Sequence, residues 1–208
     1  MQDEYRTLAR AGVHETEVNR SRFLCSLAPA ATEREAQDFV AAVRARHADA
    51  THNCWAYVIG ADAAIQKASD DGEPGGTAGV PMLQMLLRRD MRYVVAVVTR
   101  YYGGVKLGAG GLIRAYGGAV GAALDALGTV TRRRFRLATV TVDHQRAGKV
   151  ENELRAAGRD VRGVRYGESV TLELGLPEAD VDAVRAWLAD LTAGTARFTL
   201  GGEAYGDA

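Results

Sequence analysis

The first half of the chain alternates short apolar runs with amphipathic stretches, a pattern that predicts a mixed α/β arrangement. Residues 15–29 read as one or two strands, and residues 53–60 and 63–69 read as the two arms of a hairpin. The run YVVAVVTRYY, residues 93–102, begins as a continuous apolar stretch. Such a run is typical of a strand that is buried on both faces.

Three segments of this half are predicted to be helices. Thr32 and Glu35 have the spacing of a capping box, and the apolar positions that follow fall on one helical face: Ala36, Phe39, Val40 and Val43. A helix over residues 81–89 begins with proline in its first turn and directs four side chains inward: Met82, Leu83, Leu86 and Leu87. Residues 111–127 predict a long third helix. Its small residues indicate a backbone packed closely against a sheet: Gly117, Gly118, Gly121 and Ala122.

The pattern changes near residues 129–135, where the run TRRRF indicates a linker. Beyond it we expect a strand, a helix, two strands, a helix and a strand, over residues 135–142, 147–158, 160–167, 169–176, 178–191 and 196–204. This βαββαβ order is that of a ferredoxin-like domain. The sequence therefore predicts an α+β protein with two domains, over residues 1–131 and 135–208.

Composition and charge narrow the classes of function. The chain is 47% hydrophobic, enough to bury a real core, and its 26 basic residues balance its 26 acidic residues. The two signs also balance on each side of Val130. Because a general electrostatic grip on nucleic acid needs a basic face, this balance argues against one and leaves a local basic patch open.

The cysteines and the apolar runs indicate the cellular compartment. Two cysteines, Cys25 and Cys54, cannot form a four-cysteine zinc site, and a disulfide framework is unusual in a chain of this length. The N-terminal residues are polar and lack the apolar region of a signal peptide. The longest apolar run, residues 94–98, is too short to span a bilayer. We expect a cytoplasmic protein with no membrane partner.

Eight glycines occur between Gly103 and Gly121, interleaved with charged residues. The loop at 103–111 joins the buried strand to the long helix, so unpaired backbone N–H groups and the helix dipole favour an anion there. The alternative is a tight turn that uses glycine for positive φ. No Gly-Lys-Ser/Thr follows as in a Walker A loop, and the dinucleotide fingerprint is matched only in part.

A second unusual segment, SDDGEPGGTAG at residues 69–79, contains three acids and four glycines. Its carboxylates could serve a metal ion or acid–base chemistry, or the segment could be a solvated turn. In a third interpretation, the acids order the loop by pairing with arginine: Asp70, Asp71 or Glu73 with Arg100 or Arg22. We expect this segment to lie beside the glycine-rich one, with an acid near Arg100 or Lys106.

Two smaller features carry possible chemistry. His52 and Cys54 are two residues apart, on one face if the segment is a strand. They could form a nucleophile pair, but cysteine is commonly a buried small hydrophobe and no third, orienting residue can be identified. Four arginines between residues 132 and 136 indicate either a solvated linker or a phosphate contact.

Several blocks taken together resemble the IMPACT/YigZ family over nearly the whole chain. They are NRSRF at 19–23, HNC at 52–54, SDDGEPGGTAGVPML at 69–83 and VVTRYYGGVKLGAGGLIRAYGG at 97–118. Arg20 stands where the family's Lys-Ser-Arg-Phe motif has lysine. Linked blocks in the right order are far more specific than a lone glycine motif.

The resemblance implies a fold and a cellular role. The N-terminal part would share the α/β sandwich of domain 2 of a small-subunit ribosomal protein, the fourth domain of elongation factor G and the GHMP kinases. The C-terminal part would be the small ferredoxin-like domain of bacterial members, similar to the last domain of elongation factor G. Eukaryotic relatives regulate translation by competing for a large activator of an initiation-factor kinase. They use an additional N-terminal domain that this chain lacks, so we do not expect that partner to carry over.

Three functions remain open at this level. The first is a translation regulator that binds RNA or the ribosome, with Tyr101 or Tyr102 stacked on an unpaired base and cations on phosphate. The second is an enzyme that binds a small phosphate-containing ligand in the loop at 103–111, although no complete catalytic signature is present. The third is a protein-interaction module. We expect no cofactor and no metal, and we assign no catalytic residue. The candidate binding residues are Arg22, His52, Asp71, Glu73, Arg100, Tyr101, Tyr102, Gly103, Gly104, Lys106, Gly108, Gly110, Gly111 and Arg114.

Overall fold

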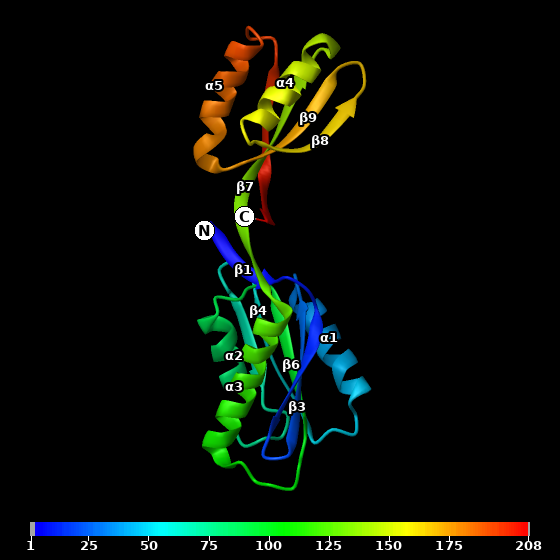
Figure 1. The fold of residues 1–208 in the computed structure, drawn as a ribbon, viewed down its shortest axis with the longest axis vertical. Coiled ribbons are helices and arrows are strands. Elements are labelled where there is room, and N and C mark those ends of the chain that lie inside the picture. The colour runs from blue at the N-terminus through cyan, green and yellow to red at the C-terminus, as the bar shows by residue number, and fades with distance from the viewer. Residues whose placement is uncertain (1–2, 208) are drawn as a thin grey trace. The chain divides into compact units, whose positions relative to one another are not determined.

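The structure, a computed structural model, describes residues 3–207 (Figure 1). The chain divides into two compact units, one ending at Arg132 and the other beginning at Arg133. Both units combine helices with a sheet. The α+β class and the two-domain organisation predicted from the sequence are confirmed.

The N-terminal unit is built on a five-stranded sheet in the order β2-β3-β6-β4-β5, with antiparallel neighbours throughout. Its strands are β2 (Gly12–Val18), β3 (Ser21–Pro29), β4 (His52–Ile59), β5 (Ile65–Ser69) and β6 (Val94–Tyr101). The turn between β2 and β3 places Asn19 and Arg20 at positive φ, as a two-residue hairpin turn of type I′ requires.

The central strand β6 is buried on both faces, as its apolar run predicts. Its side chains alternate between two cores: Val94, Ala96 and Val98 belong to one, and Val95 and Val97 to the other. The two cores meet at this strand, so β6 is the best-shielded element of the unit.

Helices cover both faces of this sheet (Figure 1). α1 (Glu33–Arg46) packs on one face, and α2 (Gly79–Arg88) and α3 (Gly108–Leu127) pack on the other. The Thr32 half of the capping box of α1 is confirmed, because this N-cap residue accepts a hydrogen bond from the Glu35 N–H. The Glu35 carboxylate accepts from the Ala31 N–H, one residue before the N-cap.

Helix α3 begins at Gly108, so Gly110 and Gly111 lie inside its first turn and not in the preceding loop. A Cβ on Gly117 would lie 3.5 Å from the Pro81 carbonyl oxygen, and one on Gly121 would lie 3.4 Å from the Met85 side chain. These glycines therefore face α2, and the expected close packing against the sheet is wrong for them. Gly118 faces open space.

The C-terminal unit has the predicted βαββαβ order. Its elements are β7 (Thr129–Val142), α4 (His144–Ala156), β8 (Asp160–Tyr166), β9 (Val170–Leu176), a 3₁₀ turn (Glu178–Asp180), α5 (Val181–Leu191) and β10 (Arg197–Asp207). The spatial order is β10-β7-β9-β8, and both helices pack on one core of alternating strand residues. This is the ferredoxin-like arrangement.

Two elements differ from the sequence prediction. Residues 129–135, interpreted as a linker, are the first half of β7, which runs unbroken for 14 residues. The short strand β1 (Glu4–Leu8) was not predicted, and it pairs with β7. Within residues 3–207 no helix combines the length and apolar character that crossing a bilayer requires.

Two glycine substitutions test the packing around α3. Gly118→Ala adds a methyl group to an exposed helical position, so we expect the free energy of unfolding to rise by about 0.5–1 kcal/mol. A Cβ on Gly103 would lie 2.0 Å from the Arg20 carbonyl oxygen in the β2–β3 turn. Gly103→Ala should therefore lower the free energy of unfolding, by about 1–3 kcal/mol. Urea titration measures both, and shifts of the same sign would contradict the packing described.

Candidate ligand-binding pocket

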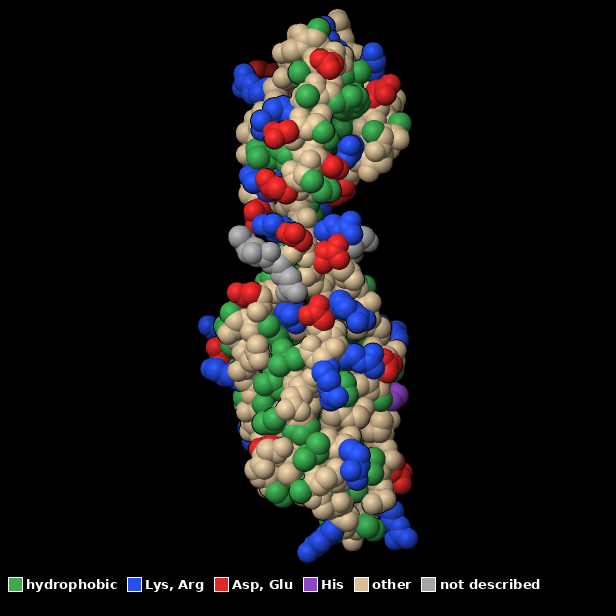
Figure 2. Space-filling view, turned by 90° about the vertical axis from the view of Figure 1, so that its left-hand side faces the viewer, with side chains coloured by type: hydrophobic (Ala, Val, Ile, Leu, Met, Phe, Trp, Pro, Cys, Tyr) green, Lys and Arg blue, Asp and Glu red, His purple; other side chains and the backbone are tan. Residues whose placement is uncertain are grey.

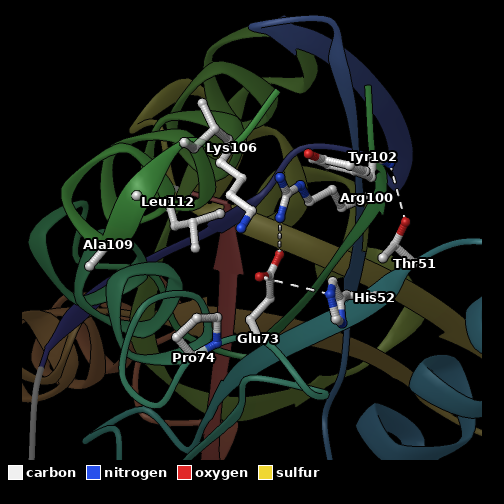
Figure 3. Close-up of a pocket in the computed structure, with 11 residues that line it drawn as sticks. Thr51, His52, Glu73, Pro74, Arg100, Tyr102, Lys106, Ala109 and Leu112 are labelled. Atoms are coloured by element: carbon white, nitrogen blue, oxygen red, sulfur yellow. Dashed lines mark hydrogen bonds and ion pairs between the residues drawn. The ribbon is translucent and has the colours of Figure 1, made fainter. Parts of the chain in front are cut away.

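A pocket of about 410 Å³ opens on the α2/α3 face of the N-terminal unit (Figure 3). Strand alternation explains which side chains reach it. Arg100 follows Val98 at a spacing of two on β6, and His52 pairs directly opposite Arg100 on β4. The pocket is lined by Thr51, His52, Glu73, Pro74, Arg100, Tyr102, Lys106, Leu107, Gly108, Ala109 and Leu112.

A buried ion pair forms the base of the pocket. Arg100 Nη1 donates to Glu73 Oε1 at 2.7 Å, and the two side chains are only 7% and 4% exposed. The guanidinium carbon lies over the rings of Phe23 and Tyr102, 5.6 and 5.4 Å from their centroids. Arg100 Nε has no hydrogen-bond partner among residues 3–207. The expected approach of an acid of the 69–79 segment to Arg100 is confirmed.

Glu73 receives a second donor on the same oxygen. The Tyr116 hydroxyl donates to Oε1 at 2.7 Å. Burial, together with Cys54 and Glu73 beside it, raises the pKa of Tyr116, so the phenol keeps the proton that it donates. Glu73 Oε2 accepts no hydrogen bond from any residue in the described range, and His52 Nε2 lies 3.8 Å from it.

The protonation of the His52 ring follows from its other nitrogen. Nδ1 lies 2.8 Å from the Asp71 carbonyl oxygen. A carbonyl oxygen can only accept, so Nδ1 carries the hydrogen and donates it. In the neutral ring, Nε2 is then an acceptor that faces the pocket.

The acidic segment is ordered by three separate sets of contacts. Asp70 accepts from the N–H groups of Gly76, Ala78 and Gly79 at 2.8–3.0 Å. Burial opposes the effect, but these donors lower the pKa of Asp70. Since Ala78 provides no side-chain cap, Asp70 serves as the cap of α2.

Asp71 is held elsewhere, by Arg44 on α1 and by the N–H of Asn53 on β4. The three carboxylates thus have three different sets of partners. No metal-binding group of His, Cys, Asp or Glu occurs within residues 3–207. The interpretation in which internal pairing orders the loop is confirmed, and the shared metal site is not formed.

The N-terminus of α3 forms one wall of the pocket. Its N-cap, Leu107, has no side chain that could cap the first turn, and no side chain in the described part of the protein caps the initial N–H groups. Lys106 extends into the pocket and forms no ion pair with a described residue (Figure 3). With the Arg100 and Lys106 cations against one Glu73 carboxylate, the pocket favours an anionic ligand.

The two tyrosines after Arg100 face opposite ways, as strand alternation predicts. Tyr101 lies on the α1 side, where its hydroxyl bonds His47 and Asp49 and its ring receives the Arg22 guanidinium at 5.5 Å. Tyr102 lines the pocket and is 46% exposed. Tyr102 is therefore the ring available for stacking.

The structure brings six of the fourteen candidate residues together at the pocket: His52, Glu73, Arg100, Tyr102, Lys106 and Gly108. It places the other eight outside the lining: Arg22, Asp71, Tyr101, Gly103, Gly104, Gly110, Gly111 and Arg114. Five lining residues carry no chemical signal in the sequence and were missed: Thr51, Pro74, Leu107, Ala109 and Leu112. They are identified only in the folded structure, where residues 51–52, 73–74 and 100–112 come together around the pocket.

His52 and Cys54 share a face, but they do not form a nucleophile pair. Cys54 is fully buried, and its thiol donates to the Asp70 carbonyl oxygen at 2.9 Å. Burial raises the pKa of this thiol to about 12. Nδ1 of His52, which a third residue would hold in a catalytic triad, already donates to the Asp71 carbonyl oxygen.

Comparison with known proteins covers both units. A family model described as the Impact N-terminal domain matches residues 19–124, a range that includes every residue lining the pocket. A second model, a domain of unknown function (DUF1949), matches residues 140–195.

Bacterial relatives match along most of their length. The chain is 47% identical over 194 residues to the IMPACT family member YvyE of Bacillus subtilis, covering 93% of this chain and 89% of the relative. It is 40% identical over 181 residues to YigZ of Escherichia coli, covering 86% and 89%. The match to protein IMPACT of Danio rerio is 44% identical over 64 residues and covers only 20% of that relative. A crystal structure of a hypothetical protein, 36% identical, superposes with a TM-score of 0.63 over 95% of this chain and 97% of that one.

The ion pair can be tested by removing one charge and then both. Arg100→Met leaves the Glu73 carboxylate buried without its cation, so we expect the free energy of unfolding to fall by about 3–5 kcal/mol. The double variant Arg100→Met/Glu73→Gln removes the stranded charge and should recover at least half of this loss. Arg114→Met, at an exposed position, is the control and should change little. The single variant Glu73→Gln completes the comparison. A double variant whose loss of unfolding free energy equals the sum of the losses in Arg100→Met and Glu73→Gln would contradict the pairing.

The thiols provide a second test. Burial raises the pKa of both Cys25 and Cys54, so neither forms the reactive thiolate at pH 8. We expect iodoacetamide to leave both cysteines unmodified in the native protein and to modify both after unfolding, as measured by mass spectrometry. Rapid modification of native Cys54 would instead indicate an activated nucleophile.

Proposed function

The chain belongs to the IMPACT family, and from that premise we propose that it is a cytoplasmic, translation-associated protein that binds single-stranded RNA, free or on the ribosome. In this proposal one nucleotide of the strand enters the pocket. The observation that carries the proposal is the combination of two cations, a helix N-terminus and an open aromatic ring around one pocket.

The chemistry of the lining matches the parts of a nucleotide. Lys106 and the uncapped N–H groups at the start of α3 suit a phosphate. One face of the Tyr102 ring is occupied by Arg100, and the ring is still 46% exposed. An unpaired base can stack on the open side, a contact that contributes about 1–3 kcal/mol per base.

The size of the pocket favours a single strand over a duplex. A volume of about 410 Å³ lies in the range of small-ligand sites and leaves room for roughly one nucleotide. Duplex RNA, in contrast, is recognised across a broad surface. Acidic and basic side chains are intermixed on the face shown in Figure 2, which supports weak binding through a few phosphate contacts.

A second candidate function is binding of a small phosphate-containing molecule. The observation in its favour is the apolar part of the lining, Pro74, Leu107 and Leu112, which suits a compact ligand enclosed on several sides. A mononucleotide that competes as strongly as an oligonucleotide would favour this candidate over RNA.

Fluorescence anisotropy with labelled single-stranded RNA tests the proposal. Three or four phosphate contacts predict a log–log salt slope of roughly −2 to −3. Tyr102→Ala should weaken binding by about tenfold through lost stacking. Lys106→Ala should also weaken binding and make the slope shallower by about 0.7.

Lys149→Ala, at an exposed position of α4, is the matched control and should change neither quantity. Absence of binding at low salt would contradict the proposal. So would binding that both pocket variants leave unchanged, or binding that high salt leaves unchanged.

A further inference from the structure

We infer that the pocket takes up its anionic ligand together with a proton, which His52 carries. The inference rests on the proposed function and names how that site is regulated: RNA binding strengthens as the pH falls. It comes from the histidine–carboxylate pair of the lining, in which one nitrogen of His52 lies near Glu73 and both side chains line the same cavity.

The hydrogen bond on one side of the His52 ring directs a second proton to the other side. Nδ1 already donates its hydrogen to the Asp71 carbonyl oxygen at 2.8 Å, so the neutral ring can gain a proton only at Nε2. Nε2 lies 3.8 Å from Glu73 Oε2, and dashed lines in Figure 3 join the Glu73 carboxylate to both His52 and Arg100. Protonation therefore places an N–H group with a positive charge in the lining of the pocket.

The charged groups around His52 come from the strand and the two loops beside it. They are Arg100 on β6, Glu73 and Asp71 in the loop between β5 and α2, and Lys106 in the loop before α3. Two further titratable neighbours, Tyr116 and Cys54, have pKa values raised by burial and stay neutral. Arginine and lysine keep their charges between about pH 5.5 and 8, and carboxylates ordinarily titrate below that range, so histidine is the residue type of this set that changes charge there.

Protonation of His52 changes the charge balance of the pocket. With the neutral ring, two cations of the lining, Arg100 and Lys106, face one carboxylate, that of Glu73. The imidazolium adds a third cation. Because the His52 side chain is only 19% exposed, water screens this charge less than it screens a charge on the protein surface. The protonated protein therefore holds an anion in the pocket more strongly.

The coupling between proton and ligand acts in both directions. A ligand that the protonated form binds more tightly must itself favour protonation, so binding draws protons from the solution. The added affinity is fully present where histidine is protonated, and it is lost as the pH rises through the range of about pH 5 to 8 in which histidine titrates. A fall in pH across this range strengthens binding.

Affinity for oligouridylate at pH 5.5 and at pH 7.5 tests the inference on the unaltered protein. The probe is a single strand without terminal phosphates, and neither its phosphodiester linkages nor its base takes up a proton in that range. At constant ionic strength we expect binding to be about three- to tenfold tighter at pH 5.5. Fluorescence anisotropy with a dye of pH-independent emission measures the ratio of the two affinities.

A variant assigns the pH dependence to His52. Glutamine is polar but does not titrate, so His52→Gln should reduce the ratio of affinities to less than about twofold. His144→Gln is the matched control. That histidine also bonds a backbone carbonyl, but it lies in the C-terminal unit and does not line the pocket, so the full ratio should remain.

Calorimetry counts the protons directly. Titrations at pH 6.5 in two buffers of different ionisation enthalpy should show net proton uptake on RNA binding by the unaltered protein and by His144→Gln. They should show none with His52→Gln.

The outcomes separate this inference from the proposed function. Equal affinity at both pH values, with Tyr102→Ala and Lys106→Ala still weakening binding, would overturn the proton coupling and leave RNA binding standing. A pH dependence or a proton uptake that His52→Gln leaves intact would overturn the assignment to His52. No RNA binding at either pH, or binding indifferent to the two pocket variants, would overturn both.

Discussion

The buried ion pair between Arg100 and Glu73 is the contact on which the candidate site depends. It joins the end of the central strand β6 to the loop between β5 and α2, and Tyr116 adds α3 to the same carboxylate. Because either charge would be costly to bury without its partner, β6, the loop and α3 must assemble together. The pocket is the space that remains where they meet.

The three acids of the loop between β5 and α2 each contact a different part of the N-terminal unit. Asp70 bonds three backbone N–H groups and caps α2, and Asp71 links the loop to α1 and β4. Glu73 uses one oxygen to join the loop to β6 and α3. One of its oxygens is anchored and the other faces the pocket, an arrangement suited to recognition of a ligand.

Much of the fold was predictable from local patterns. The apolar run before Arg100, the capping box at Thr32 and the βαββαβ order each follow from local periodicity, and charge complementarity brought the acidic and glycine-rich segments together. The start of α3 at Gly108 was not predictable, because glycines are poor helix formers and tertiary packing overrides that preference. The arginine run in β7 resembles a solvated linker, and only pairing with other strands makes it a strand. The apolar lining residues, such as Leu112, are ordinary core residues until the fold brings them to the pocket.

The central claim is that this pocket, assembled by Arg100 and Glu73, is where the protein holds RNA. A crystal structure with a short single-stranded RNA tests it most directly. We predict a phosphate at the start of α3 beside Lys106 and a base on Tyr102. Density for the RNA on another surface, with the pocket holding only solvent, would contradict the account.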